Sequence, residues 1–416
     1  MDRYSSKYLF SSLKPMEASF NPRVAAMQPS ATLAMAGRAK KLKRAGADVI
    51  ALSAGEPDFN TPEPIAQAGI EAIQDGFTRY TQNPGMPELR EAICAKFAHE
   101  NNLKYTPEQI LCSNGAKQSV ALAVTVLAAE GDEILIPAPY WVSYPEMTRF
   151  AGANPVIVPT TAETEYRLTP QALADAITER TRVLILCSPS NPTGSVYTQG
   201  ELKALVEVLQ NHERIVVVSD EIYEHVIYDA VHVPIASLSG MQERTITING
   251  FSKCFAMTGW RLGYMAGPVD IVKQAAKLQG QFTSAPCSIT QRAGIAALSM
   301  DKAPLQAMVK AFRERRDYLL ERLSTLPGVQ APKPEGAFYL FPQINDYYGT
   351  IAPSGRMINS SDDLCFYLLE EHLVALVPGA AFGDPDGIRI SYASSMDDLR
   401  KAFDRIETGL KQLSQR

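Results

Sequence analysis

The stretch of sequence that decides the fold is Thr245-Ile246-Thr247-Ile248-Asn249-Gly250-Phe251-Ser252-Lys253-Cys254-Phe255-Ala256-Met257-Thr258-Gly259-Trp260-Arg261-Leu262-Gly263. Its first four residues are all β-branched and predict a buried strand. Lys253 follows the end of that strand, after the small residue Ser252, and Arg261 follows a Gly-Trp step. A lysine amine can bind a carbonyl carbon covalently, and a guanidinium can donate two parallel hydrogen bonds to a phosphate. The stretch therefore predicts a strand end with a reactive lysine and an anion-binding arginine.

Strand-like runs and helical segments alternate on the N-terminal side of this stretch and continue beyond it, from about residue 60 to 310. The predicted strands are 109–112, 133–136, 155–158, 183–186, 215–218 and 245–248, and helices such as 117–130, 200–212 and 269–281 lie between them or after them. Apolar strands that alternate with helices are typical of parallel sheets covered on both faces. We therefore expect an α/β fold, with a mostly parallel sheet in a large domain over residues 61–309.

The two ends of the chain have a different pattern. Residues 21–60 and 310–416 predict a smaller α+β domain built from both termini, with a charged helix at 309–326 and strands at 336–341, 375–377 and 388–392. We expect a linker helix to join the domains near residues 290–325. We expect residues 1–20 to form an N-terminal arm that lies on a partner subunit. The alternative, that they are a remnant of an organellar targeting segment, stays open.

Composition excludes several classes of partner. The 416 residues carry a formal net charge of −5, without the basic surface that nucleic acid requires. No apolar run reaches the ~20 residues of a membrane span. The six cysteines form no C-x-x-C pair and have no metal-ligand spacing with histidine, so we expect free thiols and no metal. A cytoplasmic location is the expectation, with organellar import left open.

Polar clusters follow four of the predicted strands. They are residues 113–118, 189–194, 219–223 and the stretch around Lys253. Ligands of open parallel sheets bind beyond the carboxyl ends of the strands, so we expect the four clusters to form one composite site. The first cluster opens a helix, whose N-terminus attracts phosphate. Each also has a plain structural interpretation: Gly115 suits a turn, Asn191 an Asn-Pro turn, Asp220 a helix cap and Lys253 a solvated lysine after a strand.

These clusters, in this order, resemble fold-type I pyridoxal-phosphate enzymes, and among them the class I aminotransferases of the aspartate aminotransferase Ib subgroup. The resemblance covers nearly the whole chain and extends to residues 29–32, 54–62, 79–80, 139–144 and 387–392. It implies pyridoxal 5'-phosphate as the cofactor and amino acids and 2-oxo acids as substrates. It also implies a homodimer with shared active sites.

The resemblance implies a role for each residue of the site. The implied catalytic residues are Lys253, Asp220 and Tyr223. Of these, Lys253 would bind the cofactor covalently and Asp220 would pair with its ring nitrogen. The implied cofactor contacts are Lys253, Gly115, Ala116, Lys117, Trp141, Asn191, Asp220, Tyr223, Arg261 and, from the neighbouring subunit, Tyr80. The implied substrate contacts are Gly55, Thr32, Lys117, Trp141, Asn191 and Arg389, the last as a clamp on the α-carboxylate. Gly250 departs from the pattern, because some relatives have a phosphate-binding serine there.

The substrate-binding residues narrow the expected substrates. Residues 281–288 contain no arginine for a distal carboxylate, and Lys117 is the natural substitute. Thr32 and Lys117, with residues 77–81 and 278–281, resemble the prephenate aminotransferases, which transfer an amino group from glutamate or aspartate to prephenate and form arogenate. We expect this activity together with transamination of oxaloacetate and 2-oxoglutarate. Two alternatives stay open: an aspartate aminotransferase without prephenate activity, and a pyridoxal-phosphate β-lyase acting on cysteine conjugates.

Overall fold

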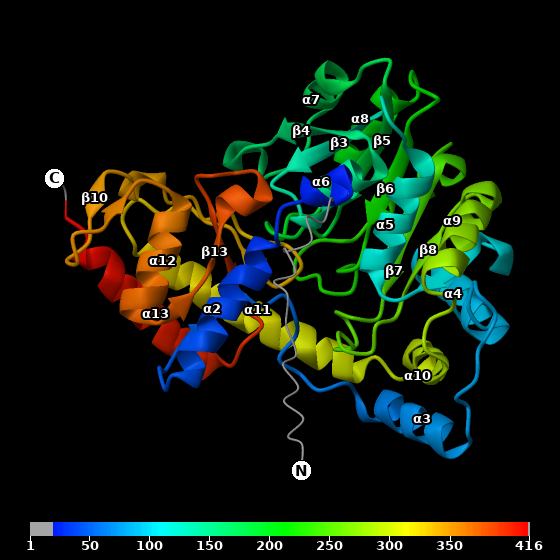
Figure 1. Ribbon diagram of the computed structural model, residues 1–416, viewed down its shortest axis with the longest axis horizontal. Coiled ribbons are helices and arrows are strands. Elements are labelled where there is room, and N and C mark those ends of the chain that lie inside the picture. Colours follow the sequence, from blue (N-terminus) through cyan, green and yellow to red (C-terminus); the bar gives the residue numbers. More distant parts are fainter. Residues whose placement is uncertain (1–19, 415–416) are drawn as a thin grey trace, which may run out of the picture.

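The computed structural model describes residues 20–414, and within that range the largest element is a seven-stranded sheet (Figure 1). Across the sheet, the strands are β2 (Ile110–Ser113), β8 (Gly263–Ala266), β7 (Thr245–Gly250), β6 (Val216–Asp220), β5 (Thr181–Cys187), β3 (Glu133–Ala138) and β4 (Asn154–Pro159). β8 is antiparallel to both neighbours, and the other pairings are parallel. The predicted α/β fold with a mostly parallel sheet is therefore confirmed.

Helices cover both faces of the sheet. Alternate side chains of a strand point to opposite faces, and here both sets are apolar and buried. Ile134 and Ile136 of β3 share a buried cluster with α5, α6 and α9, whereas Leu135 lies in a cluster with α7 and α8. On that second face, α4 and α10 cover β2 and β8. The helices of this part are α3 (Glu63–Gln74), α4 (Pro87–Glu100), α5 (Ala116–Leu127), α6 (Ser143–Ala151), α7 (Pro170–Ala176), α8 (Gln199–Leu209), α9 (Val269–Phe282) and α10 (Ser288–Ser299).

The stretch from Thr245 to Gly263 forms β7, a loop and the start of β8. The sequence predicts β7 but not β8, whose four residues follow the Gly-Trp-Arg step without a separate apolar run. β8 pairs with β7 through Gly250 opposite Gly263. The loop that joins two neighbouring strands therefore carries both Lys253 and Arg261.

A second group of elements, from both ends of the chain, lies beside the sheet on the left of Figure 1. Its members are α2 (Ala31–Arg44), β1 (Ile50–Ala51), β9 (Tyr339–Leu340), β10 (Thr350–Ile351), β11 (Met357–Ile358), α12 (Ser361–His372), β12 (Val374–Ala375), β13 (Val377–Pro378), β14 (Ile388–Ser391) and α13 (Met396–Gln412). The short helix α1 (Pro22–Ala25) lies instead against α6 of the large sheet. β1 pairs in parallel with β12, which joins the two termini. One buried cluster unites Met35 and Leu52 with Tyr339 and Leu399. The limits of this group as a separate domain stay a prediction.

The predicted linker helix near residues 290–325 is α11 (Ala303–Ser324), and a separate helix, α10, precedes it. The Asp301 carboxylate accepts a hydrogen bond from the Ala303 amide at 2.6 Å, and Pro304 occupies the first turn of α11, where proline is tolerated. Leu305 packs with α4 and α10, whereas Met308 and Phe312 lie in the core of the second group. α11 therefore runs from one core into the other (Figure 1).

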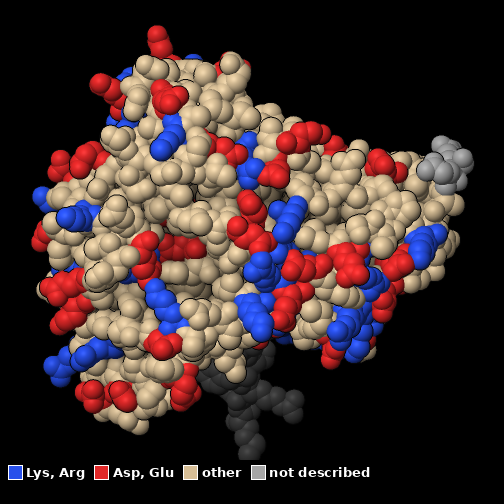
Figure 2. Space-filling model, turned by 180° about the vertical axis from the view of Figure 1, so that it is seen from behind, with Lys and Arg blue, Asp and Glu red and all other residues tan. Residues whose placement is uncertain are grey.

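On the face drawn in Figure 2, acidic and basic side chains are interspersed. Within residues 20–414, no helix combines the length and the apolar character needed to cross a bilayer. The predicted arm at 1–20 lies, apart from Phe20, outside the described residues.

Candidate active site

A cavity of about 490 Å³ opens where β5, β6 and β7 end, and residues of α2 also line it. Eleven of the predicted site residues meet there: Thr32, Gly55, Ala116, Lys117, Trp141, Asn191, Asp220, Tyr223, Lys253, Arg261 and Arg389. Gly115 is the residue before α5 and does not itself line the cavity, and Tyr80 is fully exposed outside it. The composite site predicted from strand ends is thus one continuous cavity.

The Lys253 amine lies where its neutral form is favoured. Nζ donates a hydrogen bond to the Gly55 carbonyl oxygen, in the loop after β1. Burial, together with the charges of Arg389 and Arg261, lowers the pKa of Lys253 to about 8 against the opposing carboxylate of Glu56. A lysine with this pKa is partly neutral near neutral pH, so it can act as a nucleophile or a base.

Two cations lie near the N-terminus of α5. Arg261 donates to the carbonyl oxygens of Thr258 at 2.9 Å and Asn114 at 3.2 Å, and Lys117 Nζ lies 4.9 Å from the centroid of the Trp141 ring. Neither cation forms an ion pair with a carboxylate in the described part of the chain. Burial lowers the pKa of Lys117, and the charge of Arg261 adds to this. Because the first amides of a helix have no intrahelical acceptor, this place suits a phosphate.

Close backbone contacts shape the loop around Arg261. A Cβ atom on Gly263 would lie 2.3 Å from the Ala116 nitrogen, and one on Gly250 would lie 2.9 Å from the Gly263 Cα. Gly250 therefore has a steric reason to lack a side chain where some relatives are expected to have serine. Ser252 lines the cavity instead. Arg261 itself has a φ of 58°, a strained conformation of the kind that clusters at functional sites.

Asp220, the last residue of β6, is a buried carboxylate. It accepts hydrogen bonds from the Tyr144 hydroxyl at 2.7 Å and from the Ile222 amide at 3.3 Å. Burial raises the pKa of Asp220 to about 6, although the bond from Tyr144 acts to lower it. No cationic side chain within residues 20–414 forms an ion pair with it. The Asp220 carboxylate can therefore pair with a positive charge on a ligand.

Arg389 on β14 is a guanidinium that is only 2% exposed. It donates to the Asn191 side-chain oxygen at 3.0 Å and to the Ser53 carbonyl oxygen at 2.8 Å. Both acceptors are neutral, and Arg389 Nε has no hydrogen-bond partner among the described residues. Since a buried charge is costly without a counter-charge, the site suits a carboxylate that accepts bonds from both arms of the fork.

Sequence reasoning missed several residues of the cavity. Tyr144, on α6, lies in the run 139–144, but nothing in the sequence pointed to Asp220 as its partner. Tyr339 lies in the predicted strand 336–341, yet its hydrogen bond to Tyr223 spans 116 residues. Glu56, whose carboxylate accepts a bond from the Thr258 hydroxyl at 3.0 Å, also lines the cavity. Its place in the family-like run 54–62 was the one available signal.

Comparison with known proteins decides the family. The family model described as "Aminotransferase class I and II" matches residues 47–406. The chain belongs to this aminotransferase family.

Known relatives of this aminotransferase agree with the match. It is 54% identical over 400 residues to an aspartate aminotransferase from Pinus pinaster, over 95% of this chain and 81% of that one. A bifunctional aspartate aminotransferase and glutamate/aspartate-prephenate aminotransferase from Petunia hybrida is 54% identical over 399 residues, 95% of this chain and 83% of the relative. The crystal structure of the aspartate aminotransferase from Rhizobium meliloti has a TM-score of 0.92 and 42% identity, over 95% of this chain and 100% of the other. The predicted fold and enzyme class are therefore confirmed.

Enzymes of this family use pyridoxal phosphate, and the cavity of this aminotransferase fits that cofactor. The amine of Lys253 can bind its aldehyde, and the buried Asp220 carboxylate can pair with a protonated ring nitrogen. Arg261 and the N-terminus of α5 offer donors to its phosphate. Trp141 offers an aromatic face in the same cavity.

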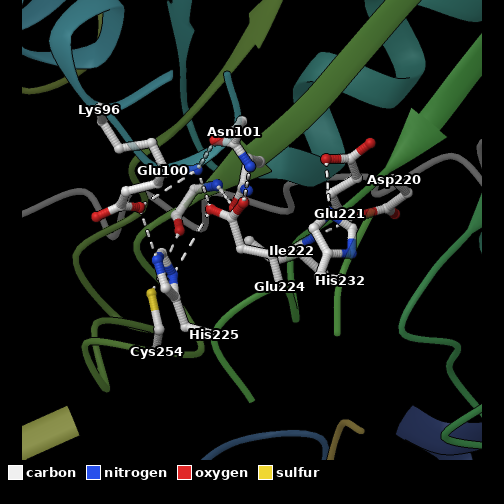
Figure 3. Close-up of polar contacts among 12 residues, drawn as sticks. Lys96, Glu100, Asn101, Asp220, Glu221, Ile222, Glu224, His225, His232 and Cys254 are labelled. Carbon is white, nitrogen blue, oxygen red and sulfur yellow. Dashed lines mark hydrogen bonds and ion pairs between the residues drawn. The ribbon is translucent and has the colours of Figure 1, made fainter. Parts of the chain in front are cut away.

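Behind the cavity, a buried ion pair fixes the segment of this aminotransferase that carries Asp220 and Tyr223 (Figure 3). The Glu224 carboxylate pairs with Lys96 and accepts a bond from the Asn101 amide at 3.0 Å. Burial alone would raise the pKa of Glu224, but the charge of Lys96 and those of two nearby histidines lower it to about 2. The Glu224 carboxylate therefore stays charged over the physiological range.

Glu221 and His232 form a second buried pair (Figure 3). Nε2 of His232 lies 2.9 Å from the Glu221 carboxylate, which also accepts a bond from the Ser219 hydroxyl at 2.7 Å. Burial acts to lower the pKa of His232, but the charge and hydrogen bond of Glu221, together with the charge of Glu224, outweigh it, and the net shift is upward. Asp220, Ile222 and Tyr223 line the cavity, whereas Glu221 and Glu224 belong to this network. One side of the segment therefore faces the cavity and the other side faces the network.

The His232 pKa predicts how the stability of the aminotransferase depends on pH. A histidine with a raised folded pKa stabilises the protein fully below its unfolded pKa of about 6.5, and this stabilisation is lost as the pH rises through the folded value. We expect Glu221→Gln to lower the free energy of unfolding by about 3 kcal/mol at ~pH 6, and by clearly less at ~pH 9. Urea unfolding at the two pH values measures this, with the exposed Glu207→Gln as the control. Equal losses at both pH values would contradict a charged His232.

Proposed function

We propose that this aminotransferase transfers amino groups between glutamate or aspartate and 2-oxo acids, with prephenate, which gives arogenate, as an acceptor besides oxaloacetate and 2-oxoglutarate. The observation that carries the proposal is the set of cations in the cavity. Arg389, Lys117 and Arg261 all line it without a carboxylate partner in the described chain. With Arg261 assigned to the cofactor phosphate, two cations remain for a substrate that carries two carboxylates.

The proposed roles follow from the geometry. Arg389 binds the substrate α-carboxylate from its buried fork, and Asn191 keeps that fork in place at 3.0 Å. Pyridoxal phosphate, when bound, withdraws electrons from the substrate Cα. Lys253 Nζ then removes the proton from that carbon and later returns a proton, a role that its pKa of about 8 favours. Asp220 keeps the ring nitrogen protonated, and Tyr223 and Asn191 hydrogen-bond the ring oxygen.

Lys117 and Thr32 are the proposed contacts to the distal carboxylate. Thr32 is at the start of α2, after Ser30, whose hydroxyl caps the helix at the Leu33 amide. Lys117 lies beside Trp141 in the same cavity. A flexible lysine and a hydroxyl can reach acids of different length, which suits both the short oxaloacetate and the ring acid prephenate. The Petunia relative is named for both activities and the Pinus relative for aspartate alone.

Substitution of these two residues tests the contact. We expect Lys117→Ala or Thr32→Val to lower kcat/KM for prephenate by about tenfold or more, because a hydrogen bond to a charged group contributes about 1.5–3 kcal/mol. The half-reaction with alanine, which has no distal carboxylate, should change by less than about twofold. Lys203→Ala, an exposed lysine on α8, is the matched control. Equal losses with prephenate and alanine would sink the assignment.

The proposed assembly is a homodimer with shared active sites, in which the partner subunit's Tyr80 reaches the cofactor phosphate. Tyr80 is fully exposed in the single chain, so it is free to contact a second copy. Light scattering of the purified protein measures the mass. A monomer that retains full activity would contradict this assembly.

The decisive test of the function is a coupled rate assay on cofactor-loaded enzyme, with glutamate or aspartate as donor and prephenate or oxaloacetate as acceptor. A kcat/KM for prephenate within about tenfold of that for oxaloacetate, a gap of ~1.4 kcal/mol, supports the dual activity. Activity with oxaloacetate alone would leave an aspartate aminotransferase. Release of pyruvate and ammonia from a cysteine conjugate, without transamination, would support the β-lyase instead.

A further inference from the structure

Tyr339 is a buried residue of the cavity that none of the roles above uses. It lies on β9, where it pairs with Ser391 of β14, two residues beyond Arg389. Its side chain has no exposed surface, and it comes from the C-terminal group of elements. Its two neighbours in the cavity are Tyr223, from the large sheet, and Arg389.

The hydroxyl of Tyr339 meets that of Tyr223 at 2.8 Å. A phenol has one proton to donate and lone pairs that can accept. If Tyr223 gives its proton to the ring oxygen of the cofactor, its oxygen can only accept, so Tyr339 must be the donor of this bond. The Tyr339 hydroxyl also lies against Gly55, where a Cβ atom would approach it to 3.0 Å, so little space remains for another position.

The face of the Tyr339 ring contacts the second neighbour, Arg389. Arg389 Cζ lies 4.6 Å from the ring centroid, the geometry of a cation–π contact. Asn191 and Ser53 hold two edges of the same guanidinium. Phe382 offers a second ring, with its centroid 5.0 Å from the same Cζ. The nearer face of Tyr339 therefore helps to fix the plane of the fork, while the two polar contacts fix its direction.

We propose that Tyr339 is a positioning residue for both anchors of the site: its hydroxyl orients Tyr223 toward the cofactor oxygen, and its ring holds Arg389 ready for a carboxylate. The hydroxyl half of this inference rests on the role proposed for Tyr223. A donor on the Tyr223 oxygen polarises its O–H bond, which strengthens its bond to an anionic oxygen on the cofactor. The two halves can be separated, because phenylalanine keeps the ring and leucine keeps neither group.

The experiment uses the loaded enzyme with two readouts other than turnover. The first is a pH titration of its visible absorbance, and the second is the Kd for maleate, a dicarboxylate that cannot react. The variants are Tyr339→Phe, Tyr339→Leu and Tyr223→Phe. Tyr392→Phe is the matched control, since Tyr392 is also buried and bonded to a second tyrosine, Tyr228, at 3.2 Å, but does not line the cavity.

We expect Tyr339→Phe to raise the midpoint of the absorbance titration by about half a pH unit, as the loss of one hydrogen bond implies. Its Kd for maleate should stay within about twofold of wild type, whereas Tyr339→Leu should weaken maleate binding by about fivefold or more. Tyr392→Phe should change neither readout.

Each contrary result has a separate meaning. A wild-type midpoint for Tyr339→Phe, with a shifted midpoint for Tyr223→Phe, would overturn the hydroxyl link alone. A wild-type midpoint for Tyr223→Phe would overturn its proposed role and the hydroxyl link with it. A wild-type Kd for maleate in Tyr339→Leu would overturn the role of the ring face, independently of Tyr223.

Discussion

Replacing Lys253 with alanine will lower kcat by about 10⁴-fold or more. The substitution removes the amine that we propose both to bind the cofactor and to move the substrate proton. A positioned general base alone contributes about 10²–10⁴-fold, and loss of the covalent route adds to this. Lys253 lies in the cavity with a pKa lowered to about 8, which suits both tasks. Steady-state rates with aspartate and 2-oxoglutarate measure the loss.

Two further measurements test whether this loss is specific to the amine. Lys253→Arg keeps a positive charge but not a group that loses its proton, so its kcat should fall nearly as far. Pyridoxal phosphate should still bind to Lys253→Ala, because Arg261, Asp220 and the N-terminus of α5 remain. Dialysis followed by absorbance measures the retained cofactor. A kcat close to that of wild type in either variant would refute the proposed mechanism.

Replacing Arg389 with lysine will lower kcat/KM for dicarboxylic amino acids by about 10²–10³-fold. A lysine keeps the charge but cannot present a planar fork to both carboxylate oxygens. Arg389 is also held by Asn191 and Ser53, and a lysine would leave at least one of these acceptors unpaired. Removing one partner of a buried charge pair costs about 2–5 kcal/mol, which sets the expected range. The loss should lie mainly in KM.

A second buried arginine offers the matched control. Arg315 on α11 forms a bidentate ion pair with Asp58 at 2.7 and 2.9 Å, outside the cavity. Arg315→Lys should lower thermal stability while kcat/KM changes by less than about threefold. Similar losses of kcat/KM in both variants would mean that Arg389 acts through the fold rather than on the substrate.

The sequence predicted those parts of the structure that follow from local patterns. The runs of β-branched and apolar residues identified β3, β5, β6 and β7, and the rule that ligands bind at strand ends brought Asn191, Asp220 and Lys253 together. The family resemblance then added Arg389, which lies on another sheet. Local patterns suffice here because each of these strands is buried and continuous.

The parts that were missed depend on contacts between distant segments. β8 has four residues and depends on pairing with β2 and β7 for its definition. The strand that carries Tyr339 was expected, but only the folded chain shows that its side chain meets Tyr223. The break between α10 and α11 depends on the local geometry of Asp301 and Pro304. The apolar periodicity of the sequence does not reveal that geometry.

The alternation along residues 219–225 matters for anyone who wishes to redesign this enzyme. Nearly every side chain there either faces the cavity or takes part in the buried network, so a library of random changes in that segment would mostly yield proteins that fold poorly or lose their cofactor. α2 offers a safer place for variation. Leu33 and Ala36 line the cavity, and Leu33 is 71% exposed, so its replacement disturbs little packing. New substrate preferences should therefore be sought first on α2.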